Sequence, residues 1–174
     1  MNIPVYIQHA PTVLDGTAKV WIDDFLAGLP KEATILEIGS GTGRDAEYIE
    51  RKGYPVIRTD IHQEFVDHQR TAYEKQVYIY DVTKDSLPPN LPQTYDAILA
   101  RSVLNHFTLE DLKKIFMTLA ARLNPGGKLA FNITKEFDLN EIASILKNNQ
   151  IQIYETRAVE GEQWAYLLCG KKGK

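Results

Sequence analysis

Residues 35–45, which read ILEIGSGTGRD, hold the residue types best suited to binding chemistry in this chain. A short apolar run carries the acidic Glu37 and is followed by glycine at every second position, at Gly39, Gly41 and Gly43. Because glycine lacks a Cβ, such a turn lets a bulky ligand lie against the backbone where a strand ends and a helix begins. The pattern therefore predicts a nucleotide-like ligand at this turn.

The spacing of the glycines separates two classes of nucleotide site. The dinucleotide pattern is G-x-G-x-x-G, in which the third glycine lets the helix pack closely on the strand while the helix N-terminus holds a pyrophosphate. Counted from Gly39 and Gly41, that third glycine would stand at position 44, where the chain has Arg44. The observed spacing, E-x-G-x-G-x-G, argues against a dinucleotide such as NAD.

Two further carboxylates and a proline-glycine turn follow at the ends of later apolar runs. Asp60 lies about 20 residues beyond the glycines, where a carboxylate can accept hydrogen bonds from both hydroxyls of a ribose, in a dinucleotide site as well as in others. Asp81 ends the next run, in Tyr-Asp-Val, and residues 123–127 read LNPGG before another apolar run.

Taken in order, these four elements resemble the class I, Rossmann-like S-adenosylmethionine-dependent methyltransferases. The turn at residues 37–43 is similar to the family's first motif, and residues 123–127 are similar to its late L-x-P-G-G signature. The resemblance extends over about Thr17 to Gly170. It implies S-adenosylmethionine as the cofactor and transfer of its methyl group as the activity.

The resemblance also implies a role for each residue of the glycine turn. Gly39, Gly41 and the backbone of Ser40 between them would line the methionine part of the cofactor, and Gly43 would also belong to the cofactor site. Glu37 would support the turn and meet the cofactor's ammonium group, directly or through water.

The later motifs imply contacts to the nucleoside. Asp60 would hold the ribose, Ile61 and Val82 would sandwich the adenine, and Asp81 would accept a hydrogen bond from its amino group. These roles belong to the resemblance and not to the spacing alone.

Three residues are expected near the sulfonium and the carboxylate of the cofactor. Ala100 and Arg101, at the end of the fourth strand, would lie beside the sulfonium. The guanidinium of Arg44 could meet the carboxylate, since such charge-assisted pairs are strong; the alternative is an ordinary cation on a helix surface.

Two residues are candidates for a catalytic role. His106 follows the fourth strand where an acceptor would sit, and it is either a general base or a hydrogen-bonded residue leading into the next helix. Tyr6 stands in residues 1–16, a segment that forms a lid over the cofactor in many members of the family; the alternative is a disordered terminus.

The sequence alternates short apolar runs, which predict strands, with segments of helical periodicity, which predict helices, and these elements must position the residues above. Because only three residues separate the last two runs, they must form an antiparallel hairpin. We therefore expect an α/β fold: a three-layer Rossmann-like sheet of seven strands, five parallel plus a C-terminal antiparallel hairpin, with residues 17–174 as a single methyltransferase-like domain. The expected strands are 34–38, 54–60, 76–82, 94–100, 128–134, 151–159 and 163–170, with helices at 17–29, 44–52 and about 62–75 and two more capped at Thr108 and Asp138.

Composition restricts the partners and the compartment. The 174 residues carry a net charge of −3 with both signs scattered along the chain, which argues against a nucleic-acid partner or an anionic membrane surface. No apolar run is long enough for a membrane span. Cys169, the single cysteine, lacks the neighbours of a zinc site, so we expect no metal and a cytoplasmic location.

Two classes of methyl acceptor are excluded because the chain lacks the motif residues that their enzymes need. DNA amine methyltransferases carry an acidic or Asn residue followed by Pro-Pro-aromatic after the fourth strand, where residues 100–103 read ARSV. Cytosine C5 enzymes need a Pro-Cys pair, and Cys169 follows Leu168.

A small-molecule acceptor is expected. The alternatives are a protein or nucleic-acid acceptor, or a regulatory protein that binds the cofactor without catalysis. The sequence leaves the oligomeric state open.

Overall fold

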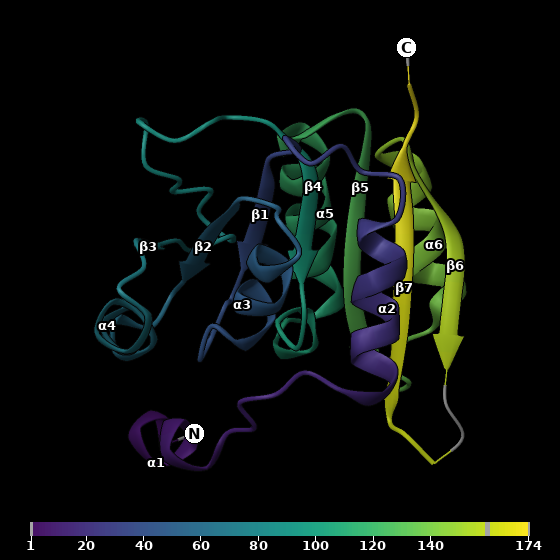
Figure 1. Ribbon diagram of the computed structural model, residues 1–174. Coiled ribbons are helices and arrows are strands. Elements are labelled where there is room, and N and C mark those ends of the chain that lie inside the picture. The colour runs from purple at the N-terminus through teal and green to yellow at the C-terminus, as the bar shows by residue number, and fades with distance from the viewer. Residues whose placement is uncertain (1, 159–160, 174) are drawn as a thin grey trace.

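A seven-stranded sheet lies between helices on its two faces in the computed structural model, which describes residues 2–158 and 161–173 (Figure 1). The strands are β1 (Ile35–Ile38), β2 (Val56–Asp60), β3 (Val77–Ile79), β4 (Tyr95–Ala100), β5 (Leu123–Thr134), β6 (Ile151–Ala158) and β7 (Trp164–Lys171). The helices are α1 (Ile3–His9), α2 (Gly16–Leu26), α3 (Arg44–Arg51), α4 (Gln63–Tyr73), α5 (Leu109–Arg122) and α6 (Leu139–Asn148), with a 3-10 turn, η1, at Leu104–His106.

The central strand β1 is buried on both faces because helices cover both. Every residue of β1 is buried, and successive side chains of a strand point to opposite faces. Leu36 and Ile38 pack into the core beneath α5 and α6, whereas Ile35 packs into the core beneath α2 and α3. Figure 1 shows α2 and α3 in front of the sheet and α5 and α6 behind it.

The order of the strands, β3-β2-β1-β4-β5-β7-β6, creates the edge at which a ligand can bind. Strands β1 to β5 pair in parallel, while β7 is antiparallel to both β5 and β6. The predicted fold is thus confirmed. From β1 the chain builds outward to β2 and β3 on one side and to β4 and β5 on the other, and such a reversal opens a crevice at the carboxyl ends of the strands.

Several element boundaries differ from those expected, and two of the differences have a visible cause. β5 begins at Leu123 rather than at residue 128, because Leu123 pairs with Tyr95 and a register shift then absorbs the Asn-Pro-Gly-Gly turn within the strand. β3 ends at Ile79, since the chain turns where Asp81 accepts a hydrogen bond from the Thr83 N–H at 3.0 Å. The last residue expected in β6, Val159, lies outside the described residues.

The segment before residue 17 contains a helix that apolar periodicity did not predict. α1 begins at Ile3, and its first turn is capped by the Asn2 side chain, which accepts from the Val5 N–H at 3.2 Å. Tyr6 places its ring edge-to-face with Phe65 of α4, with 5.9 Å between the ring centres. In Figure 1, α1 and the chain that follows it lie beneath the carboxyl ends of the strands.

No described helix is both long and apolar enough to cross a lipid bilayer.

Candidate cofactor-binding site

The glycine turn between β1 and α3 has three glycines in the left-handed region, with φ of +67° at Gly39, +53° at Gly41 and +83° at Gly43. A Cβ on Gly39 would overlap Val103 Cγ2, and a Cβ on Gly43 would lie 2.7 Å from Gln69 Oε1. A Cβ on Gly41 would meet no atom within 4 Å. Gly39 and Gly43 are therefore required by packing, and Gly41 is the position whose open side can face a ligand.

Asp60, at the end of β2, fixes the turn from the neighbouring strand. Its Oδ2 accepts from the Gly41 N–H at 2.9 Å, and its Oδ1 accepts from the His62 N–H at 2.9 Å. The Ser40 N–H also donates to the Thr59 carbonyl, at 2.8 Å. A carboxylate oxygen accepts more than one hydrogen bond, so Asp60 can hold the backbone and still accept from hydroxyl groups.

Glu37 is a buried carboxyl group, 3% exposed, on β1 behind the turn. Its Oε2 has no hydrogen-bond partner in the described structure, although buried polar atoms almost always have one. Burial raises the pKa of Glu37 well above its usual range, and the nearby Asp45 and Asp60 raise it further against the opposing charge of Arg58. An unpartnered oxygen in this position fits a missing cationic donor.

Two arginines meet one buried carboxylate beside the turn. Both Nε and Nη2 of Arg101 donate to Asp45, with 3.0 Å from Nη2 to Oδ1, and Arg44 Nε donates to the same Oδ1 at 3.1 Å. Asp45 thereby joins the end of β4 to the start of α3, and it holds both guanidinium groups at the carboxyl edge of the sheet.

A cavity of about 270 Å³ opens next to these arginines, between the starts of α2, α3 and β7 and the end of β4. Its charged and polar lining includes both signs of charge, which suits a zwitterionic group. That part of the lining comprises Asp15, Thr17, Arg44, Arg101, Glu162 and Tyr166.

The residues expected around an adenine follow the ends of two paired strands. The Tyr80 N–H donates to the Asp60 carbonyl at 3.0 Å, so the chain after β2 and the chain after β3 lie side by side. Ile61 is 52% exposed, whereas Val82 is buried in the core. Hydrogen bonds from Thr83, at 2.6 Å from its hydroxyl, lower the pKa of Asp81 and keep it an acceptor.

The structure does not bring the two catalytic candidates into a common hydrogen-bonded group. His106 is exposed in η1, where its backbone N–H donates to the Val103 carbonyl at 3.2 Å. Tyr6 is 46% exposed on α1. Ala100 is fully buried, so its methyl group does not reach the surface of the site.

Sequence reasoning missed Gln69, Arg58 and Val103, all of which shape the glycine turn. The one available signal was Gln69 itself, an amide four residues after Phe65 on the apolar side of α4. No described group of three or more His, Cys, Asp or Glu side chains is placed to hold a metal ion.

Comparison with known proteins points to one family. Residues 14–171 match a family model described as a methyltransferase domain. The tRNA 5-carboxymethoxyuridine methyltransferase of Escherichia coli K12 is 28% identical over 122 residues, which are 65% of this chain. The match takes in 46% of that relative, so the chain spans less than half its length.

Solved structures of methyltransferases share the fold. An S-adenosylmethionine-dependent methyltransferase from Clostridium acetobutylicum superposes with a TM-score of 0.75 at 16% identity, covering 98% of this chain and 97% of that one. Magnesium protoporphyrin IX methyltransferase from Synechocystis, with S-adenosylmethionine bound, superposes with a TM-score of 0.71 at 19% identity, covering 88% and 76%.

The open side of Gly41 gives a first testable prediction. Gly41→Ala should weaken binding of S-adenosylhomocysteine at least about tenfold, because the new methyl group occupies the ligand's side of the turn. The left-handed backbone should add a stability loss of roughly 1–2 kcal/mol. Calorimetric titration and thermal unfolding measure the two effects.

Gly28 provides a matched control. It has a φ of +76° and also meets no atom within 4 Å of an added Cβ, but it lies in the turn after α2. Gly28→Ala should lose comparable stability and keep its affinity. Equal affinity in both variants would show that Gly41 does not face the ligand.

Glu37 gives a second prediction, for the protein without ligand. The pKa of Glu37 in the folded protein lies above the ordinary value of 4.5, so on raising the pH the unfolded chain loses the carboxyl proton before the folded protein does. The contribution of Glu37 to the free energy of unfolding therefore falls as the pH rises from about 4.5 to the folded pKa. The slope is up to about 1.4 kcal/mol per pH unit. Glu37→Gln should therefore gain in melting temperature relative to the unsubstituted protein as pH rises. A pH-independent difference would contradict the assignment.

Proposed function

This chain belongs to the methyltransferase-domain family whose model spans residues 14–171, and from that premise we propose that it moves the methyl group of S-adenosylmethionine to a small-molecule acceptor. The observation that carries the proposal is the turn at Gly41, which is open on one side, is hydrogen-bonded to the carboxylate of Asp60, and follows the strand that carries the unpartnered oxygen of Glu37.

The donor set at the turn fits the methionine part of the cofactor. The free Oε2 of Glu37 would accept from the ammonium group. Arg44, which lines the adjacent cavity, would meet the carboxylate, and Arg101 would lie beside the sulfonium. The backbone of Gly39, Ser40 and Gly41 would pass beneath this part of the cofactor.

The nucleoside would extend along the ends of β2 and β3. Asp60 would accept from the ribose hydroxyls with the lone pairs that Gly41 and His62 leave free. Asp81 would accept from the amino group of the adenine, with Ile61 on one side of the ring and Val82 beneath it.

When bound, S-adenosylmethionine supplies a methyl carbon already activated by the sulfonium, so transfer is an in-line displacement at that carbon. The chain's own residues need to align the acceptor and exclude water. We assign the exclusion of water to residues 1–16 as a lid, since α1 and the chain after it lie beneath the carboxyl edge (Figure 1).

A general base is needed only when the acceptor must lose a proton, as a hydroxyl does. His106 and Tyr6 are the side chains assigned to that task, and both are exposed enough to meet a bound molecule. A carboxylate, a thiolate or a neutral amine would need placement alone.

Charge supports a small acceptor. The net charge of −3 provides no general attraction for a polyanion, and the cavity beside Arg44 carries carboxylates as well as guanidinium groups. The E. coli relative, whose name makes it a tRNA methyltransferase, supports an RNA acceptor as the second candidate.

The cofactor is tested first by thermal unfolding with S-adenosylmethionine, S-adenosylhomocysteine and NAD. The first two should each raise the melting temperature. At a ligand concentration one hundred times the dissociation constant, the free energy of unfolding should increase by about 2.7 kcal/mol. Stabilisation by NAD alone would overturn the proposal.

Methyl transfer is then screened with hydroxyl, carboxylate, amine and thiol compounds and with unmodified tRNA. Cofactor binding without turnover on any of these would favour the non-catalytic alternative.

Arg44→Ala tests the contact to the cofactor carboxylate. Loss of a charge-assisted hydrogen bond of roughly 1.5–3 kcal/mol should weaken S-adenosylhomocysteine binding about ten- to a hundredfold. Affinity for methylthioadenosine, which lacks the amino-acid part, should stay unchanged. Arg51→Ala, on the exposed end of the same helix, is the control. If Arg44→Ala weakens both ligands equally, the carboxylate contact is wrong.

A further inference from the structure

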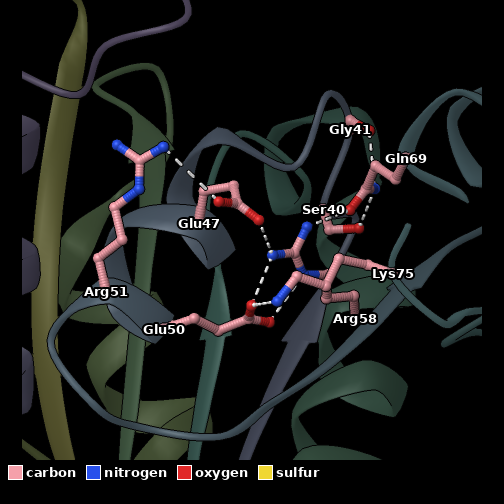
Figure 2. A network of polar contacts seen from close by, with 8 residues as sticks. All are labelled: Ser40, Gly41, Glu47, Glu50, Arg51, Arg58, Gln69 and Lys75. Atoms are coloured by element: carbon pink, nitrogen blue, oxygen red, sulfur yellow. Dashed lines mark hydrogen bonds and ion pairs between the residues drawn. The ribbon is translucent and has the colours of Figure 1, made fainter. Parts of the chain in front are cut away.

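Gln69, on α4, lies behind the glycine turn and is completely buried. Its Nε2 donates to Ser40 Oγ at 2.7 Å and to the Gly41 carbonyl at 2.9 Å (Figure 2). Its Oε1 accepts from Arg58 Nη1 at 3.2 Å. One amide therefore uses both of its hydrogens on the turn and its oxygen on a buried guanidinium.

Arg58 fixes the direction in which this amide points. A guanidinium donates hydrogen bonds and accepts none, so the amide oxygen must face Arg58 and the NH₂ group must face the turn. The reversed amide would set N–H against N–H and would turn its oxygen toward the Gly41 carbonyl.

Arg58 is itself held rigidly, at 1% exposure in the middle of β2. Its Nε donates to Glu50 Oε1 at 2.9 Å and its Nη2 to Glu47 Oε1 at 2.6 Å, both on α3 (Figure 2). Lys75 reaches Glu50 Oε2 at 2.6 Å. Although burial opposes it, hydrogen bonds from Arg58 and Lys75 lower the pKa of Glu50, which keeps the carboxylate charged.

These contacts act on both polar groups of Gly41. The N–H of Gly41 is bonded to Asp60 of β2, and its carbonyl is bonded to Gln69 of α4. With both groups turned toward the protein, the Cα of Gly41 keeps the open side that an added Cβ would fill. Gln69 also occupies the space next to Gly43, which explains why that position tolerates no side chain.

We infer that Gln69, oriented by Arg58, is a positioning residue for cofactor binding: it holds the Gly41 carbonyl away from the ligand and so keeps the turn in its binding shape. The inference rests on the proposed function, since it concerns the same site. It assigns to a helix outside the turn the task of preorganising the backbone beneath the methionine part of the cofactor.

Gln69→Glu separates this positioning role from ordinary packing. Glutamate keeps the length of the side chain and pairs with Arg58, which offsets part of the cost of burying a charge, so the protein should still fold. It offers no N–H, and it sets a carboxylate oxygen against the Gly41 carbonyl. The dissociation constant for S-adenosylhomocysteine should rise about tenfold or more by calorimetry. Amide exchange across residues 39–44 should become faster in the free protein.

Arg70→Met is the matched control, because it breaks the hydrogen bond from Arg70 Nη2 to the Val77 carbonyl at 2.7 Å on the same helix and leaves Gln69 and Arg58 in place. It should lower the melting temperature while the dissociation constant stays within about twofold. Gln69→Met, which keeps the length without donors or charge, repeats the test should Gln69→Glu not fold, and it should show the same loss of affinity.

The outcomes distinguish the two proposals. If the unsubstituted protein does not bind S-adenosylhomocysteine, the proposed function fails. If it binds, and the folded Gln69 variant binds as tightly with unchanged exchange at residues 39–44, the positioning role is overturned. A loss of affinity in Arg70→Met equal to that in Gln69→Glu would also overturn it, because it would show a general effect of lost stability.

Discussion

Where a turn of the backbone faces a ligand, the N–H and carbonyl groups that do not bind the ligand need hydrogen-bond partners within the protein. Here the constraint falls on Gly41, whose N–H is bonded to Asp60 and whose carbonyl is bonded to Gln69. Unbonded, either group would have to bond water or turn into the open space beside the Gly41 Cα. The positions of β2 and α4 relative to β1 are therefore part of the site, because each strand or helix supplies one of the two bonds.

The charges around the turn follow from the same requirement. Arg58 fixes the amide of Gln69, and a buried guanidinium needs paired carboxylates, which α3 supplies as Glu47 and Glu50. On the other side, Asp45 pairs with both Arg44 and Arg101 at the edge of the cavity. Glu37 differs from these groups, because it is a buried carboxyl whose Oε2 has no hydrogen-bond partner in the described structure.

Local pattern predicted the elements well where burial alone determines them, as in β1, whose four residues are all buried. Local pattern did not predict an element or its first residue where contacts with other parts of the chain determine them. β5 starts at Leu123 because of its pairing with Tyr95, and α1 is ordered by Asn2 and by the contact of Tyr6 with Phe65. The family resemblance singled out the turn and the strand-end carboxylates, but nothing in the motif pointed to Gln69, which meets the turn from 29 residues away.

The most direct test of this account is a crystal structure grown with S-adenosylhomocysteine. We expect the homocysteine part over the open side of Gly41, its ammonium at Glu37 Oε2, the ribose at Asp60, and the Gln69 amide still bonded to the Gly41 carbonyl. A ligand bound away from this turn, or a turn that reaches the ligand only after the Gln69 bond has broken, would contradict it.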